Sequence, residues 1–290
     1  MGISQMNIDT VKVRLARNSD EIAAAQRLRY KVFYEEYAAK ADADTLANRR
    51  DSDAFDAITD HLIVLDESNE DPETRIVGTY RLLRREAAEK HGAFYTSGEY
   101  DINPLLHSDA TLLELGRSCV LAEYRTRPVL QLLWQGITDY MLDHNIDLMF
   151  GCASLHGTDI KALTRQLSYL HHYHLAPAEL RPRALDGRYV EMDLMPREDL
   201  DPRRDFASLP PLIKGYLRLG AGIGHGAVID EQFDTTDVCI VMPMREVSTR
   251  YRKHYERKVN RPIPSDEAAG DATDVKFAQR GEPEKMRGTP

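Results

Sequence analysis

A glutamate and an arginine stand three residues apart in a run that otherwise has the pattern of a buried strand. The run is TLLELGRSCVLAE at residues 111–123, and the two charged residues are Glu114 and Arg117. A carboxylate in such a place can accept a proton from an amine or hold an ammonium group. The alternative is a buried ion pair that only supports the strand. We predict Glu114 and Arg117 as the catalytic pair.

Other charged residues have the types needed to bind an amino acid. Asp53 and Asp56 suit ammonium groups, whereas Arg81 and Arg29 each offer a planar guanidinium to a carboxylate. Arg27 is a further candidate on the same predicted helix as Arg29. The alternative for the aspartates is that they cap a helix or lie on the surface. The alternative for the arginines is that the apolar part of the side chain only covers hydrophobic surface.

The remaining reactive side chains give weaker signals. Ser154 follows an apolar run and is predicted to hydrogen-bond a donor substrate, with a turn cap as the alternative. Cys119 lacks the His and Asp spacing of a nucleophilic triad and is expected in the core, and His61 is expected to be structural. Residues 171–174 read HHYH, but adjacent helical residues point in different directions, so no metal site is predicted.

The elements that must position these residues alternate between strand and helix patterns. In the middle of the chain they read strand, helix, strand, helix, which is typical of parallel strands in an α/β layer. We predict one domain over residues 11–258, with a C-terminal extension from about residue 185, and a disordered tail over 259–290. Strands are predicted at 11–15, 61–65, 75–83, 111–123, 147–155, 189–194, 227–230 and 237–242, and helices at 19–37, 128–143, 159–173, 209–219 and 246–258.

Composition places the chain among soluble globular proteins. Its 290 residues are 42% hydrophobic and 29% charged, and the net charge of −9 argues against nucleic acid as a partner. Three cysteines in apolar runs favour a reducing, cytoplasmic location over a disulfide framework. We expect no secretory signal, and because no apolar stretch in the sequence is long enough to span a bilayer, any contact with the inner membrane is expected to be peripheral.

Several runs resemble known families. RLRYKVF at 27–33, DAFD at 53–56, VGTYRLL at 77–83 and LELGR at 113–117 resemble both acyl-homoserine-lactone synthases and ornithine acyltransferases. GCAS at 151–154, PLIKGYLRLGA at 211–221 and IDEQFDTTDV at 229–238 resemble the L-ornithine Nα-acyltransferases of bacterial ornithine-lipid synthesis. The resemblance implies a GNAT-type α/β fold, with a mixed central sheet flanked by helices and a C-terminal extension. It also places Phe33 among the substrate-binding residues.

The same resemblance implies an activity. The family transfers a 3-hydroxyacyl chain from acyl carrier protein to the α-amine of L-ornithine, giving a lyso-ornithine lipid. GNAT enzymes that use acetyl-CoA have a Gly-rich turn after the long strand, where backbone N–H groups bind the pyrophosphate. The matching run here, RTRPV at 125–129, has no glycine. We therefore expect a carrier-protein thioester as donor, bound through Arg125 and Arg127, and no separate cofactor.

Three other functions are alternatives to this one. An autoinducer synthase of the acyl-homoserine-lactone type is disfavoured by the extra C-terminal segments, and a CoA-dependent N-acyltransferase by the missing glycines. A non-enzymatic lipid-binding scaffold is disfavoured by the charges at predicted sheet positions, because charges there need partners or a purpose.

Overall fold

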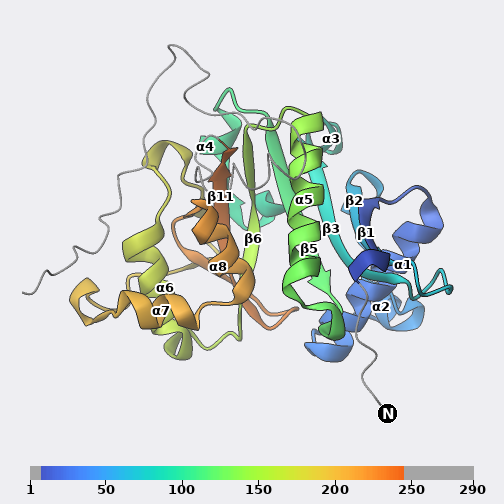
Figure 1. The fold of residues 1–290 in the computed structure, drawn as a ribbon. Coiled ribbons are helices and arrows are strands. Elements are labelled where there is room, and N and C mark those ends of the chain that lie inside the picture. The colour runs from blue at the N-terminus through green and yellow to red at the C-terminus, as the bar shows by residue number, and fades with distance from the viewer. Residues whose placement is uncertain (1–7, 245–290) are drawn as a thin grey trace, which may run out of the picture.

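The computed structural model describes residues 8–244, so the predicted helix at 246–258 and the predicted tail lie outside the described residues. A mixed sheet runs through the molecule in the order β1-β2-β3-β5-β6-β11-β10-β8, with β9 paired to β11 (Figure 1). Its strands are β1 Val11–Leu15, β2 Asp60–Asp66, β3 Ile76–Arg84, β5 Leu112–Val120, β6 Leu148–His156, β8 Tyr189–Val190, β9 Gly222–Ile223, β10 Ala227–Asp230 and β11 Thr235–Pro243. A second, two-stranded sheet pairs β4 Tyr100–Asp101 with β7 Arg183–Ala184.

Helices cover both faces of this sheet. They are α1 Ser19–Tyr30, α2 Ala43–Asn48, α3 Arg85–His91, α4 Asn103–Leu106, α5 Arg127–Asp143, α6 Ile160–His174, α7 Pro202–Ser208 and α8 Pro211–Leu219. Tyr80 of β3 points toward α8, where its hydroxyl lies 3.3 Å from that of Tyr216. The ring of Trp134, in α5, packs against the ring of Tyr216 at 5.2 Å, so α5 and α8 are neighbours. The next residue, Arg81, points to the opposite face, on which α1 lies.

Most predicted elements are confirmed within one to three residues. Asn18 caps α1 as expected, because its side chain accepts a hydrogen bond from the Glu21 amide at 2.9 Å. The predicted helix at 19–37 divides into α1 and a π-helix over Lys31–Glu36. The predicted strand at 189–194 is wrong beyond Val190, because the Glu191 carboxylate accepts hydrogen bonds from the next two backbone amides and turns the chain.

β5 and β6 are parallel, as predicted, but they pair only at their first residues. The ladder joins Leu112, Leu113 and Glu114 to Leu148, Met149 and Phe150, and both strands then continue for six residues without pairing to each other. Gly151 marks the start of this divergence, with a φ of 152°. A Cβ at this position would lie 2.2 Å from the Leu115 carbonyl oxygen, so only glycine fits here.

A bulge in β5 adds to the opening. The pairing of β3 with β5 shifts register between Thr79 and Arg81, and Arg117 has a φ of 48°. The bulge turns the Arg117 side chain to the same face of the sheet as Arg81. Among the described residues, none of the helices is long and apolar enough to cross a membrane.

Candidate active site

A cavity of about 550 Å³ lies where β5 and β6 diverge, and residues from both faces of the sheet line it. On the face of α5 and α8 the lining is mainly apolar, and we call this part the apolar chamber; it includes Tyr80, Leu133, Trp134, Ile137 and Leu212. On the opposite face the lining is polar, and we call this part the polar chamber; it includes Arg81, Tyr95, Arg117, Ser154 and Asp237.

Arg29 lies at the centre of a buried ion-pair network beneath the polar chamber. Its side chain is fully buried, with Nε 2.7 Å from Asp51 and both terminal nitrogens 2.8 Å from the two Asp56 oxygens. Burial alone would raise the pKa of Asp56, but its hydrogen bonds with Arg29 lower the pKa well below the usual range. Arg29 therefore holds the fold, and it is not among the residues that line the cavity.

Arg81 and Arg117 extend this network to the cavity wall. Arg81 lies 2.5 Å from Asp53, whereas Arg117 is more loosely paired, at 3.2 Å from Asp51 and 3.4 Å from Asp53. The ring of Tyr95 lies beneath both guanidinium groups, 4.8 Å from that of Arg117. The structure thus brings the two predicted arginines together, each paired with a carboxylate.

The predicted ammonium ligands are part of the same network. Asp53 and Asp56 form a capping box around the short 3₁₀ helix Ala54–Ala57, in which each accepts a hydrogen bond from a backbone amide. Their remaining lone pairs face arginines. Their charges are therefore neutralised inside the protein, and an ammonium ligand must be neutralised by other carboxylates.

Glu114 lines the cavity but has both oxygens engaged. They accept hydrogen bonds from the backbone amides of Tyr95 at 2.9 Å and Thr96 at 2.6 Å, and the residue is only 3% exposed. Burial raises the pKa of Glu114, and these hydrogen bonds oppose the rise. The carboxylate holds the turn that places the Tyr95 ring under Arg81 and Arg117. In this geometry Glu114 positions its neighbours, whereas its predicted role in proton transfer stays a prediction.

Glu114→Gln distinguishes these two roles. An amide can accept only one of the two N–H bonds and must point its own NH₂ at the other, so we expect the variant to unfold more easily by about 1–3 kcal/mol. We expect kcat to fall by about tenfold or less, whereas loss of a proton acceptor would lower it by about 10²–10⁴-fold. Urea unfolding and steady-state kinetics measure both quantities, with Glu86→Gln on the surface of α3 as the control. A kcat loss above about 10²-fold with unchanged stability would show that Glu114 moves the proton.

A second set of carboxylates, which we call the acid group, lies beside the polar chamber, and two of its members, Asp230 and Asp237, line the cavity. It consists of Glu99, Asp230 and Asp237, with one oxygen of each within 4.8 Å of the others. Burial, together with the charge of Glu99, raises the pKa of Asp237 to about 7. Burial also raises the pKa of Glu99, although the Cys152 thiol donates a hydrogen bond to it at 3.1 Å. Arg188 lies 3.7 Å from Glu99, and the charges of Arg188 and Arg117 also oppose this rise in pKa.

The other predicted residues fall into two places. Phe33 and Ser154 line the cavity, and Ser154 lies opposite Asp237 in the ladder between β6 and β11. Arg125 and Arg127 lie on either side of Thr126, the N-cap of α5. Arg125 lines the cavity and is held by Glu36 at 2.5 and 2.7 Å, whereas Arg127 is exposed and does not line it.

His61 and Cys119 have the structural surroundings expected of them. The Nε2 atom of His61 lies 3.0 Å from the Asp56 carbonyl oxygen, and burial lowers the pKa of the imidazole. Cys119 lines the cavity, but burial raises its pKa to about 12, so the thiolate that a nucleophile requires is not available near neutral pH.

Comparison with known proteins fixes the class to which this fold and site belong. Residues 28–135 match the family model described as an acetyltransferase (GNAT) domain. The matched residues run from α1 into α5, so this part of the chain has a GNAT-type domain. The predicted fold class is confirmed.

Curated relatives narrow the class to one family. The L-ornithine N(alpha)-acyltransferase of Agrobacterium fabrum is 49% identical over 88% of this chain and 88% of its own length. That of Brucella abortus is 50% identical, over 88% of this chain and 92% of its own length. The chain belongs to the L-ornithine Nα-acyltransferase family. A solved structure of a CoA-dependent acyl-homoserine lactone synthase is 14% identical, with a TM-score of 0.45, and covers 89% of this chain and 93% of that chain.

Proposed function

We propose that this protein transfers a long acyl chain from acyl carrier protein to the α-amine of L-ornithine. The observation that carries the proposal is the two-sided cavity, apolar on one face of the sheet and lined by excess carboxylates on the other. The names of the relatives supply the acceptor, and the geometry supplies a place for each half of the product.

The acid group fits the δ-ammonium of ornithine. At neutral pH the δ-amine, with a pKa of about 10.4, stays charged, whereas the α-amine, with a pKa of about 8, is partly free base and able to react. A group that remains cationic when bound needs carboxylates beside it. The three aspartates of the arginine network are already paired with arginines, so we assign the ammonium to the acid group, in which Asp230 and Asp237 line the cavity and Glu99 pairs with Arg188 at 3.7 Å.

Arg117 is the better placed of the two cavity arginines for the acceptor carboxylate. Its ion pairs, at 3.2 and 3.4 Å, are longer than the 2.5 Å pair of Arg81, so less is lost when a ligand competes for it. The rings of Tyr95 and Phe233 lie 4.8 and 4.9 Å from its guanidinium group and fix its direction. Arg117 and Asp237 would then hold the two charged ends of the amino acid.

The bond-forming step needs little acid–base help. The neutral α-amine attacks the thioester carbonyl, the C–S bond of the tetrahedral intermediate breaks, and the proton that the amine nitrogen gives up goes to the leaving sulfur, which departs as the carrier's thiol. The edge of β5 beyond Glu114 faces the opening without a paired strand, so its backbone amides can donate to the developing oxyanion. Positioning between the two chambers supplies the rest of the rate enhancement.

The donor's phosphodiester fits the start of α5. This helix has seventeen residues, its N-terminal amides are unpaired within the helix, and its N-cap hydroxyl, on Thr126, is buried without a hydrogen-bond partner in the described part of the chain. Arg127 is exposed beside it. A single phosphodiester needs fewer donors than the pyrophosphate of CoA, which agrees with a turn that lacks glycine.

Arg127→Ala tests this placement. We expect KM for acyl carrier protein to rise by about 3–10-fold at low salt, because one phosphate or carrier contact of about 1 kcal/mol is lost, and the difference from wild type should narrow at high salt, where that contact is screened. KM for ornithine should not change. Arg203→Ala, on the exposed surface of α7, is the matched control. Equal donor kinetics in both variants would place the carrier elsewhere.

We also propose peripheral contact with the inner membrane, since the product has a long acyl chain. Leu130 of α5 lines the cavity and is 40% exposed, and Tyr37, which also lines it, is 41% exposed. Apolar side chains at a cavity mouth suit release into lipid. Leu130→Asp should reduce co-sedimentation with lipid vesicles, and binding equal to wild type would contradict this contact.

A panel of acceptors tests the function as a whole. With a 3-hydroxyacyl carrier-protein thioester, thiol release should be fast with ornithine and slow with norvaline, which lacks the δ-amine, and with putrescine, which lacks the carboxylate. S-adenosylmethionine should give none, and product mass should show one acyl group on the α-amine. Turnover with S-adenosylmethionine but not ornithine would instead make the protein an autoinducer synthase, and preference for acyl-CoA would overturn the carrier-protein donor.

A further inference from the structure

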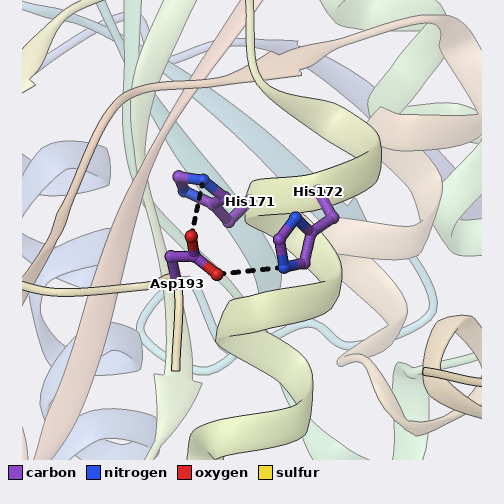
Figure 2. A group of neighbouring side chains, drawn as sticks. All are labelled: His171, His172 and Asp193. Atoms are coloured by element: carbon purple, nitrogen blue, oxygen red, sulfur yellow. Dashed lines mark ion pairs between the residues drawn. The ribbon is translucent and has the colours of Figure 1, made fainter. Parts of the chain in front are cut away.

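Three side chains converge on the surface, and none of them is among the cavity-lining residues (Figure 2). His171 and His172 belong to the last turn of α6, and Asp193 lies in the segment that follows β8. The Nε2 atom of His172 is 3.0 Å from one Asp193 oxygen, and that of His171 is 3.9 Å from the other. One ligand atom from each residue lies within 4.8 Å of the other two.

This convergence removes the reason for which a metal site was not predicted. Neighbouring residues of an α-helix are turned by about 100° from each other, so adjacent histidines were expected to diverge. The Asp193 carboxylate lies between the side chains of His171 and His172, and each of its two oxygens faces a different imidazole ring (Figure 2). The ligand that spans the gap comes from a part of the chain that is remote in sequence.

The segment that bears Asp193 is held on both sides. Glu191 accepts hydrogen bonds from the backbone amides of Met192 and Asp193, both at 2.8 Å. The backbone amide of Leu194 donates to the hydroxyl of Ser168, in α6, at 3.1 Å. The carboxylate is therefore presented to the histidines by a fixed backbone, as ligands of a metal site require.

The side chains at this place are of the types that bind a cation. His172 Nε2 lies 3.0 Å from one Asp193 oxygen and 3.0 Å from the carbonyl oxygen of Met195, and to ligate an ion it must offer its lone pair and give up a hydrogen bond to that carbonyl. Two imidazole nitrogens and one carboxylate oxygen are the ligands that Zn²⁺ and Co²⁺ accept. Tetrahedral Zn²⁺ with bonds of about 2.0–2.1 Å needs ligand atoms about 3.4 Å apart, so small rotations of the side chains suffice.

We propose that His171, His172 and Asp193 bind one divalent transition-metal ion, Zn²⁺ by ligand preference, which fastens the end of α6 to the segment after β8. Asp193 is half exposed and the histidines less so, which leaves a fourth position for water. The ring of His225 lies 6.2 Å from that of His171, and its Nε2 is 3.3 Å from the Tyr189 hydroxyl, so we do not count it as a ligand. The ion takes no part in the acyl transfer, because its ligands lie outside the cavity lining.

The test uses the full chain without a histidine tag, stripped of metal by a chelator. Titration with Zn²⁺ should show one equivalent bound and raise Tm by about 5 °C or more at saturation. Co²⁺ should give visible absorption of nitrogen and oxygen coordination, without the intense band of a thiolate ligand. Asp193→Asn and His172→Gln should each weaken Zn²⁺ binding by at least about tenfold.

His107→Gln is the matched control, because His107 is an exposed histidine in the turn after α4. It should bind Zn²⁺ like wild type. Zn²⁺ affinity unchanged in both ligand variants would place the ion elsewhere, and no Tm rise with wild type at millimolar Zn²⁺ would overturn the site. Asp193→Asn keeps the shape of the side chain, and the Tm of this variant without metal shows whether it is folded. The Co²⁺ spectrum of wild type tests the site independently of any variant.

Discussion

Asp237→Asn is expected to lower kcat/KM for ornithine by about 100-fold, which corresponds to about 2.7 kcal/mol of lost binding to a buried charge. The substitution keeps the shape of the side chain and removes the charge that we assign to the δ-ammonium. With norvaline, which has no δ-amine, wild type and variant should have similar kcat/KM values. Steady-state kinetics with both acceptors at one carrier-protein concentration measure the difference.

The same residue makes the selectivity depend on pH. Asp237 has a pKa of about 7, so its carboxylate forms as the pH rises through neutrality. The ratio of kcat/KM for ornithine to that for norvaline should therefore rise across this range in wild type and stay flat in Asp237→Asn. The ratio is the useful quantity, because the α-amines of both acceptors titrate alike and their effect cancels.

Asp237 should also carry a stability penalty. Its pKa is higher in the folded chain than in the unfolded chain, so the folded state loses stability as the pH rises from about 4 to about 7. Asp237→Asn removes this penalty, and we expect the variant to be more stable than wild type at pH 7.5 by on the order of 1–3 kcal/mol. Asp109→Asn, at an exposed position, is the control. A variant that is less stable at pH 7.5 and equally active on ornithine would remove Asp237 from the acceptor site.

Asp56→Asn is expected to have the largest effect on stability. It leaves the fully buried Arg29 with one carboxylate fewer, and loss of one partner of a buried ion pair costs about 3–5 kcal/mol. Because Arg29 and Arg81 lower the pKa of Asp56, the stabilisation is present above the usual aspartate pKa and is lost as the pH falls below it. The gap between variant and wild type should narrow below about pH 4.

Urea unfolding between pH 3 and 8 measures this effect, and Asp109→Asn again serves as the control. A loss in Asp56→Asn below about 1 kcal/mol at pH 7 would mean that water, and not Asp56, compensates the charge of Arg29. Unfolding that starts before urea is added would agree with the expected size.

The order of elements followed from the sequence because strand and helix periods are local. The predicted strands and helices and the cap at Asn18 depend on residues within a few positions of one another, and the parallel pairing of β5 with β6 was inferred from the order of these elements. The same locality explains the outcome for Asp53 and Asp56. Their spacing fitted a helix cap as well as a pair of ammonium ligands. Only the position of Arg29, on another element, shows that the Asp56 carboxylate pairs with an arginine.

The acid group and the histidine pair depend on contacts that no local pattern contains. Glu99 follows the 3₁₀ helix Tyr95–Gly98 as its C-cap and had no signal of its own in the sequence. It meets Asp237 only because β11 enters the sheet beside β6. Asp230 and Asp237 were inside a run that resembles the family, but their roles were not read from it. Tyr95, whose ring lies under two cavity arginines, was likewise not predicted.

The divergence of β5 and β6 also constrains how the product leaves. The acyl tail and the amino-acid head of the product would lie on opposite faces of one sheet. The finished molecule would therefore pass through the opening between β5 and β6. It can be released only when one end is drawn back through the strands, past the close approach of Gly151 to the Leu115 carbonyl oxygen. Drawing the polar head through an apolar chamber is the costlier direction. Product release, by withdrawal of the tail toward the polar chamber or by separation of the strands, would then limit kcat. Longer acyl chains should therefore lower the steady-state rate without lowering the rate of the first turnover.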